Sequence, residues 1–313
     1  MMMQDQPSVT ILIPCYNGAP YLERALNSCL KQTYQNLKIL IINDGSTDQS
    51  LAIIRSYLSQ YQQIRLINQP NQGIAAVRNQ LIANANSDYG FFLDVDDWIE
   101  PQCIATFVAN AKGHDLVLNS AYVHRQKVQR RPKRFYINGK IDSDINNMSY
   151  LIANAVFVWN CLFKITYVQN LGCKFKTDAP FLEDLIMVLW IYHTKAVVFL
   201  NQPHYHYLIH SHSLSHQKFM IGDLENAFKQ LEYLYQLIKQ TGCNPQCQAL
   251  NAQLCYYHCL IFSLLQFRSK LNHQQRKSFK IRLQNLEKIN GRLRWPKRYW
   301  KWGFYLLYRC FGY

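Results

Sequence analysis

Three carboxylates within four consecutive positions form the most chemically informative feature of this chain. Asp94, Asp96 and Asp97 directly follow the apolar run 89–93, in a sequence with only 19 Asp and Glu among its 313 residues. Like charges at this spacing repel one another unless a cation or several hydrogen-bond donors neutralise them. Carboxylate oxygens suit Mg²⁺ and Mn²⁺, which commonly keep coordination positions for a substrate's phosphates. An acidic turn in which Asp97 caps the next helix is the alternative, but the residues upstream favour the metal site.

The elements that must position these carboxylates are indicated by short apolar runs rich in β-branched residues. The runs are 9–13, 37–42, 64–67, 89–93 and 116–118, and amphipathic segments separate the first four. In segment 21–30 one helical face carries only small and apolar residues, namely Leu22, Ala25, Leu26 and Cys29. Pro20 suits the first turn of that helix. The pattern predicts a largely parallel sheet with helices on its faces, and such sheets bind ligands at the carboxyl ends of their strands.

Three of the predicted strands end in polar segments, and a parallel topology aims all three at the same edge. These segments are 14–18, 43–48 and 94–97. Tyr16 can stack on a nucleobase, Asp44 can accept a hydrogen bond from an imide N–H, and Asp96 can hold a metal on a diphosphate. A turn or a helix N-cap would explain any one segment, but three convergent ends favour a nucleotide site. A Gly-x-Gly-x-x-Gly motif after a strand and a Gly-Lys-Ser/Thr loop are both absent, which argues against a Rossmann dehydrogenase and a P-loop NTPase.

Four motifs in these regions together resemble the family 2 glycosyltransferases, which have the GT-A nucleotide-diphospho-sugar transferase fold. They lie at 9–18, 40–48, 71–79 and 92–97 and follow the family's order and spacing. The resemblance implies a Rossmann-like, mostly parallel α/β sheet with flanking helices. It also implies a catalytic domain at 1–215, with a donor half at about 1–120 and an acceptor half at about 121–215. Beyond it, helical spacing of apolar residues predicts a small C-terminal helical region at 216–313.

The resemblance also assigns roles to residues of the donor half. Asp44 matches the carboxylate that reads a uracil edge, and Asp94 and Asp96 match the Asp-x-Asp pair that meets the ribose and a Mn²⁺ or Mg²⁺ ion. Many members have a second Asp where this chain has Asn43, which is a mild departure. The expected donor-binding residues are Pro14, Tyr16, Asn17, Asp44, Gly73, Arg78, Asp94 and Asp96.

In the acceptor half the resemblance is weaker and extends to about residue 215. Segment 181–185 looks like the family's Glu-Asp motif, whose Asp removes the proton from the acceptor hydroxyl, so Asp184 is the expected general base. A carboxylate there also suits a helix N-terminus. The strip 205–215 resembles one that closes the domain near the diphosphate, with Leu208 where members often have Arg. His210 or His212 would replace that Arg or ligate the metal. Acceptor-side roles are expected for Asp97, Trp159, Asn160 and Glu183.

Charge is concentrated at the C-terminal end of the chain. From 265 to 313 there are 13 Lys and Arg against one acid, which is +12 of the total +15, and Trp and Tyr are interleaved with them. This pattern favours docking on an anionic membrane surface, although a packed helical subdomain would also hold such aromatics. A second basic run, 125–134, is expected to face a phosphate of the acceptor.

The remaining sequence features bear on where the protein works. The chain has no run of 18 apolar residues, and residues 1–7 lack a signal peptide's apolar core. Its ten cysteines form no paired Cys-x-x-Cys units, which favours reduced thiols. These features predict a cytoplasmic protein, peripheral on the inner face of the cell membrane.

Together the motifs predict an inverting, metal-dependent hexosyl- or N-acetylhexosaminyltransferase. Its donor is expected to be a UDP-sugar, and its acceptor a glycan or lipid-linked glycan of bacterial surface polysaccharide or lipooligosaccharide synthesis. One alternative is transfer to a polyprenyl phosphate by an enzyme of the same fold. Another is a basic nucleic-acid-binding protein, which leaves the three aspartates unexplained, so we expect no nucleic-acid partner.

Overall fold

The computed structural model describes residues 6–125, 133–134, 157–180, 183–194, 197–211, 221–242, 272–275, 277–279 and 281–282. Its contacts divide the chain into two compact units. The first comprises 1–143, 157–177 and 194–210, and the second comprises 144–156, 178–193 and 211–313. Segment 178–193 thus groups with the C-terminal residues, while the expected boundary near residue 215 stays a prediction.

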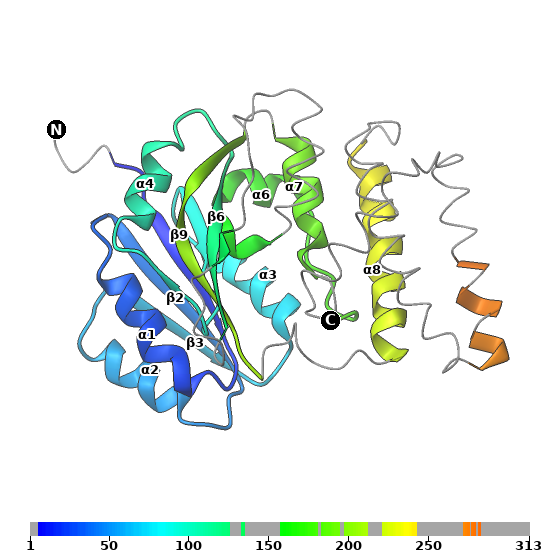
Figure 1. The fold of residues 1–313 in the computed structure, drawn as a ribbon, viewed down its shortest axis with the longest axis horizontal. Helices are drawn as coiled ribbons and strands as arrows, with labels where there is room; N and C mark the ends of the chain where they lie inside the picture. The colour runs from blue at the N-terminus through cyan, green and yellow to red at the C-terminus, as the bar shows by residue number, and fades with distance from the viewer. Residues whose placement is uncertain are drawn as a thin grey trace. The chain divides into compact units, whose positions relative to one another are not determined.

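Four parallel strands form one half of the sheet in the first unit. They are β1 (Val9–Cys15), β2 (Leu37–Asp44), β3 (Ile64–Gln69) and β4 (Tyr89–Phe92), in the spatial order β3-β2-β1-β4. The crossover helices are α1 (Ala19–Leu30), α2 (Ser50–Leu58) and α3 (Ile74–Asn84). All seven residues of β1 are buried, because helices cover both faces of this part of the sheet (Figure 1). The predicted parallel α/β arrangement is therefore confirmed.

The other half of the sheet is mixed in direction. Beyond β4 come β8 (Cys161–Lys164), β6 (Leu116–Arg125), β9 (Val197–Ile209) and β5 (Trp98–Ile99), while β7 (Lys133–Arg134) pairs with β6. Strand β8 is antiparallel to both β4 and β6, whereas β9 runs parallel to β6 and antiparallel to β5. This order places the carboxyl end of β9 beside the loop that joins β4 to β5. Segments about 110 residues apart in the sequence therefore meet there.

The core of the first unit shows why these strands lie so close together. Alternate residues of β1 pack with the apolar face of α1 and with α4 (Cys103–Ala109). Across the β4–β8 pair, a Cβ added to Gly90 would lie 2.6 Å from a ring atom of Phe163, so only glycine fits that position. A short helix, α6 (Ile165–Leu171), follows β8. The described cysteines are free and buried, as expected for reduced thiols: Cys15, Cys29, Cys103, Cys161 and Cys173.

The described part of the second unit is helical. It contains η3 (Glu183–Ile186), α7 (Met187–His193) and α8 (Ile221–Gln240). The spacing that predicted a helix after residue 216 is confirmed in α8, which buries Leu224, Phe228, Leu231, Leu234 and Leu237. Arg282 forms ion pairs with Glu225 and Glu232 of α8. No helix within the described ranges combines the length and the apolarity that a membrane crossing requires.

Candidate active site

The three polar strand ends of the first unit lie together, as the parallel topology predicted. Asn17, which follows β1, accepts a hydrogen bond on Oδ1 from the Thr47 backbone N–H at 2.8 Å. Its own N–H donates to Ser46 Oγ at 3.0 Å. The loop after β4 packs against the same segment, because a Cβ added to Gly18 would lie 2.6 Å from a methyl carbon of Val95. Glycine at position 18 thus allows the aspartate-bearing loop to approach the end of β1.

Asp44 organises the loop that precedes α3. Its buried carboxylate accepts hydrogen bonds from the Gln69 side chain at 2.8 Å, from the Gln72 N–H at 2.9 Å and from the Gly73 N–H at 2.9 Å. Gly73 has a φ of 84°, which favours glycine. A carboxylate offers about four lone-pair positions, so three internal donors leave room for one further donor.

Tyr16 and Pro14 differ in their exposure to solvent. Tyr16 immediately follows β1 and is 53% exposed, whereas Pro14 is buried within the strand. Of the two, Tyr16 is the residue whose ring has a surface for a ligand.

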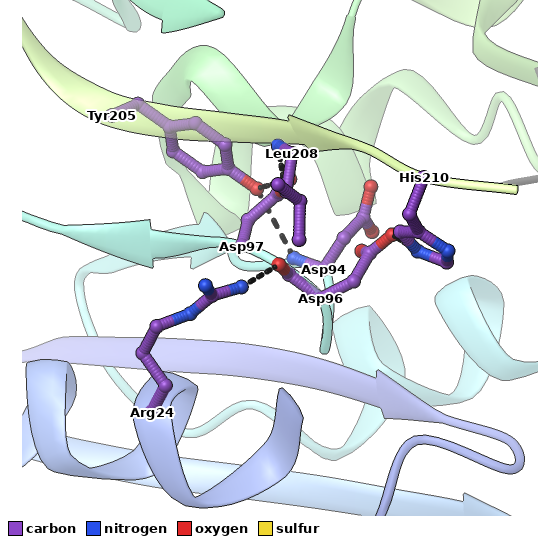
Figure 2. A network of polar contacts seen from close by, with 7 residues as sticks. All are labelled: Arg24, Asp94, Asp96, Asp97, Tyr205, Leu208 and His210. Carbon is purple, nitrogen blue, oxygen red and sulfur yellow. Dashed lines mark hydrogen bonds and ion pairs between the residues drawn. The ribbon is translucent and has the colours of Figure 1, made fainter. Parts of the chain in front are cut away.

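The first two aspartates of the loop after β4 are partly exposed, and each faces a basic side chain. Asp94 Oδ1 lies 3.5 Å from Nη2 of Arg78 on α3, and Asp96 Oδ2 lies 2.9 Å from Nε2 of His210, just beyond β9. Their side chains are 24% and 23% exposed, respectively. The ring of His210 also packs on Tyr21, with centroids 4.6 Å apart. Carboxylates from the β4 end and the buried imidazole from the β9 end therefore lie next to one another (Figure 2).

Asp97 points the other way, into the interior, where it ties the loop to β9. Its carboxylate accepts hydrogen bonds from the Tyr205 hydroxyl at 2.6 Å and from the Leu208 N–H at 2.7 Å. The Tyr205 oxygen in turn accepts the Asp94 N–H at 3.2 Å. Burial raises the pKa of Asp97 well above its usual range, and the carboxylates of Asp96 and Asp94 raise it further.

Asp97, for which an acceptor-side position was expected, is fully buried. That role stays a prediction. Trp159 and Asn160, which were also expected on the acceptor side, lie in η2 (Val158–Asn160) and are buried as well. Trp159 stacks on Tyr207 with centroids 5.2 Å apart, and Asn160 donates to the Asn119 carbonyl at 2.9 Å. Their contact with an acceptor stays a prediction.

Glu183 and Asp184 occupy the first turn of η3 in the second unit. The residues that follow them, from Leu185 to Ile191, are all buried, so the turn that carries both carboxylates is anchored in packed structure. The role of Asp184 as general base and that of Glu183 on the acceptor side stay predictions. His212 lies outside the described residues.

Two residues that contact the loop carrying Asp94, Asp96 and Asp97 were not singled out from the sequence. Arg24 of α1 donates from Nη2 to the carbonyl oxygen of Asp96 at 2.6 Å. Tyr205 belongs to the strip assigned to the diphosphate, but its bonds to Asp94 and Asp97 were not foreseen. The solvent-facing side of α1 resembles that of any surface helix, so the sequence offered no signal for Arg24.

Beside the network lies a cluster of stacked rings built on β5, β6 and β9. His206 Nε2 lies 2.7 Å from Glu100 Oε1, and its Nδ1 lies 2.8 Å from Nε2 of His124. Trp98 stacks on His206 with centroids 4.8 Å apart. Burial lowers the pKa of both imidazoles, which favours their neutral form at pH 7. The cluster therefore packs as uncharged rings against the strand that carries Tyr205 and His210.

Curated relatives of the chain are found among bacterial glycosyltransferases. EpsH of Bacillus subtilis is 29% identical over 226 residues, which cover 67% of this chain and 63% of that protein. The processive diacylglycerol β-glycosyltransferase of Mycoplasma pneumoniae is 26% identical over 253 residues, which cover 75% of this chain and 73% of that protein. The chain thus spans less than two thirds of EpsH.

Solved structures share the fold at low sequence identity. Residues 1–349 of S. aureus TarS, in complex with UDP-GlcNAc, superpose with a TM-score of 0.72 at 16% identity, covering 91% of this chain and 82% of that one. The mannosyltransferase PcManGT of Pyrobaculum calidifontis, in complex with GDP-Man and Mn²⁺, gives a TM-score of 0.54 at 17% identity and coverages of 97% and 85%. These likenesses confirm the predicted GT-A fold.

The sequence profile of the family described as "Glycosyl transferase family 2" matches residues 10–170. Apart from Val9, the match includes all four donor-half motifs. Because it covers more than half of the 313 residues, the chain belongs to glycosyl transferase family 2.

Proposed function

We propose that this protein is an inverting glycosyltransferase that moves a hexosyl or N-acetylhexosaminyl group from a UDP-sugar to a glycan or lipid-linked acceptor. The observation that carries the proposal is the pair of partly exposed carboxylates, Asp94 and Asp96, at the sheet edge that also holds Tyr16 and Asp44. A nucleotide-diphosphate sugar needs a surface for the base, a polar partner for the base edge and a means of neutralising two phosphates. This edge offers the first two, and its carboxylates could hold the cation that would supply the third.

The nucleotide end of the donor would bind at the ends of β1 and β2. The exposed ring of Tyr16 offers a stacking surface, and Asp44 retains acceptor capacity for a uracil imide N–H beyond its three internal bonds. Support for UDP comes from the TarS fragment, which has the same fold and was solved with UDP-GlcNAc. Asn17 and Gly73 would contribute mainly by shaping the two loops.

The diphosphate end calls for a divalent cation, and the residues present fit one. Asp94 and Asp96 supply hard oxygen ligands, and each already faces a cationic or imidazole group. Among the described residues, no three His, Cys, Asp or Glu side chains form a ready metal cage. That agrees with Mg²⁺-type sites, in which one or two carboxylates and the substrate's phosphates share the ion. Asp96 would hold the ion with help from Asp94, and His210 is a further candidate ligand.

The reaction itself would be one in-line displacement. The acceptor oxygen forms a bond to the anomeric carbon while the bond from that carbon to the diphosphate oxygen breaks, which inverts the configuration. Asp184 would take the proton of the acceptor hydroxyl. The electron pair of the broken bond leaves with the nucleoside diphosphate, whose charge a bound cation would stabilise.

Nucleotide-binding assays with the purified protein test this proposal. With Mn²⁺ present, we expect UDP-sugars to bind and to be slowly hydrolysed, and GDP-sugars to bind more weakly. Tyr16→Ala should weaken UDP binding roughly tenfold, since stacking on a base contributes about 1–3 kcal/mol. Tyr61→Ala, which changes a tyrosine between α2 and β3, is the matched control. If none of the UDP- and GDP-sugars binds, the proposed donor site is excluded.

For the acceptor we propose a lipid-linked molecule at the inner face of the cell membrane. Support comes from the basic and aromatic residues of 265–313 and from the M. pneumoniae relative, whose name gives diacylglycerol as its acceptor. Residues 297–313 lie outside those that the structure describes. Deleting them should move the protein from anionic liposomes to the soluble fraction and leave sugar-donor hydrolysis largely intact.

Salt provides the internal control for membrane attachment. Charge interactions are screened over about 10 Å at 0.1 M ionic strength, so salt should weaken binding of the full-length protein to liposomes. Aromatic insertion should persist and leave partial binding. A full-length protein that ignores anionic liposomes at low salt would exclude membrane docking.

A further inference from the structure

Arg24 contacts the aspartate loop from the side opposite β9. It lies on α1, and its Nη2 donates to the carbonyl oxygen of Asp96 at 2.6 Å (Figure 2). The guanidinium carbon lies 4.0 Å from the ring centroid of Trp98, the residue that follows the loop. Stacking of this kind holds a planar guanidinium in one orientation. The guanidinium carbon also lies 5.8 Å from the ring centroid of Tyr21, so one hydrogen bond to the loop and two ring contacts place this side chain.

This hydrogen bond completes the restraint of a single peptide unit. The carbonyl oxygen of Asp96 and the N–H of Asp97 belong to the same planar group. Its oxygen accepts the Arg24 bond, and its N–H donates to the Asp94 carbonyl at 3.0 Å. With both polar ends held, the plane cannot rotate without breaking one of the two bonds. The Cα of Asp96 lies in this plane, so the point at which its side chain leaves the backbone is held, while His210 contacts the carboxylate itself at 2.9 Å.

The other anchors of the loop act on different atoms. Tyr205 and Leu208 hold the Asp97 carboxylate, and Tyr205 also accepts the Asp94 N–H. Within the described part of the chain, Arg24 supplies the bond to the Asp96 carbonyl oxygen. Because a guanidinium stays protonated in proteins, its bond to the carbonyl is charge-assisted and stronger than a bond between neutral groups.

We infer that Arg24 is a positioning residue that sets Asp96 in the orientation needed to hold a divalent cation. This inference rests on the metal-dependent function proposed above, and it concerns a residue on a helix outside the four sequence motifs. Partners that orient a metal ligand typically account for 10–100-fold in metal affinity. Arg24 orients Asp96 through a bond to its backbone carbonyl oxygen rather than to its carboxylate.

The direction in which cation affinity changes when the guanidinium is removed separates this role from a purely electrostatic one. A guanidinium near the site repels a cation, so removal of its charge alone would strengthen cation binding. Removal of the hydrogen bond would instead release the Asp96–Asp97 peptide and weaken cation binding. The two explanations therefore predict opposite changes for the same substitution.

Mn²⁺ binding in the presence of UDP, measured by the electron paramagnetic resonance signal of the free ion, tests the inference without turnover. Arg24→Met should raise the Mn²⁺ dissociation constant about 10–100-fold. Arg24→Lys keeps the charge but loses the planar fork, and should lie between the wild type and Arg24→Met. Glu23→Gln changes a neighbouring exposed charge on α1 and should bind as the wild type does. Circular dichroism confirms that each variant is folded.

Three results would overturn the inference. Unchanged or tighter Mn²⁺ binding by folded Arg24→Met would show that the guanidinium acts through charge or not at all. Wild-type affinity in Arg24→Lys would show that the planar fork and its stacking on Trp98 do not set the Mn²⁺ affinity, and this result decides the case if Arg24→Met does not fold. Absence of Mn²⁺ binding by the wild type with UDP would reject the metal site itself, and so the metal-dependent part of the proposed function.

Discussion

Asp184→Asn is expected to lower kcat for sugar transfer by about 10²–10⁴, the usual contribution of a positioned general base. Asparagine has nearly the same shape but cannot accept the proton of the acceptor hydroxyl. The substitution should be tolerated structurally, because Asp184 is only partly buried and precedes the packed residues of η3 and α7. Initial rates of transfer at saturating donor and acceptor measure the effect.

UDP binding by the same variant separates catalysis from donor contact. Calorimetric titration should give an affinity for UDP close to that of the wild type. Glu183→Gln removes the neighbouring carboxylate from the same turn and should reduce kcat far less. Normal turnover in Asp184→Asn would place the base elsewhere, and lost UDP affinity would assign Asp184 to the donor site or to structure.

Much of the donor half could be predicted because its signals are local. Each strand of the parallel half is a short apolar run, and β1 is buried on both faces, so its sequence is continuously apolar. Once the strands are parallel, the polar segments that follow them must meet at one edge. Tyr16, Asp44, Asp94 and Asp96 were found in this way, and each lies at the edge expected for it.

The rest of the site depends on pairings that sequence periodicity does not encode. Asp97 and Tyr205 are 108 residues apart in the chain and meet only because β9 lies next to β5. Adjacent aspartates give no sign that one faces solvent and the next is buried. This difference in exposure becomes clear only from the turn in which the Asp97 N–H donates a hydrogen bond to the Asp94 carbonyl oxygen. Arg24 was missed because its partner is a main-chain oxygen, which any sequence provides.

Removing divalent cations with EDTA is expected to abolish sugar transfer, and adding Mn²⁺ or Mg²⁺ to restore it. A donor diphosphate at this edge would face the carboxylates of Asp94 and Asp96. At an effective dielectric constant of about 20, two like charges about 4 Å apart repel by about 4 kcal/mol. The guanidinium of Arg78 offsets part of this repulsion in the free protein, but the phosphates add negative charge that this one group does not match.

Asp96→Asn tests whether the cation acts at this carboxylate. The variant should need much more Mn²⁺ for half-maximal activity, because an amide oxygen is a weaker ligand than a carboxylate for a hard cation. Asp88→Asn is the matched control. Asp88 accepts hydrogen bonds from Ser8 just before the amino end of β4. The same chemical change therefore falls at the end of the strand opposite to Asp96. The Mn²⁺ requirement of Asp88→Asn should equal that of the wild type. Full activity of the wild type in EDTA would remove Asp96 from the proposed role, since catalysis would then need no cation at these carboxylates.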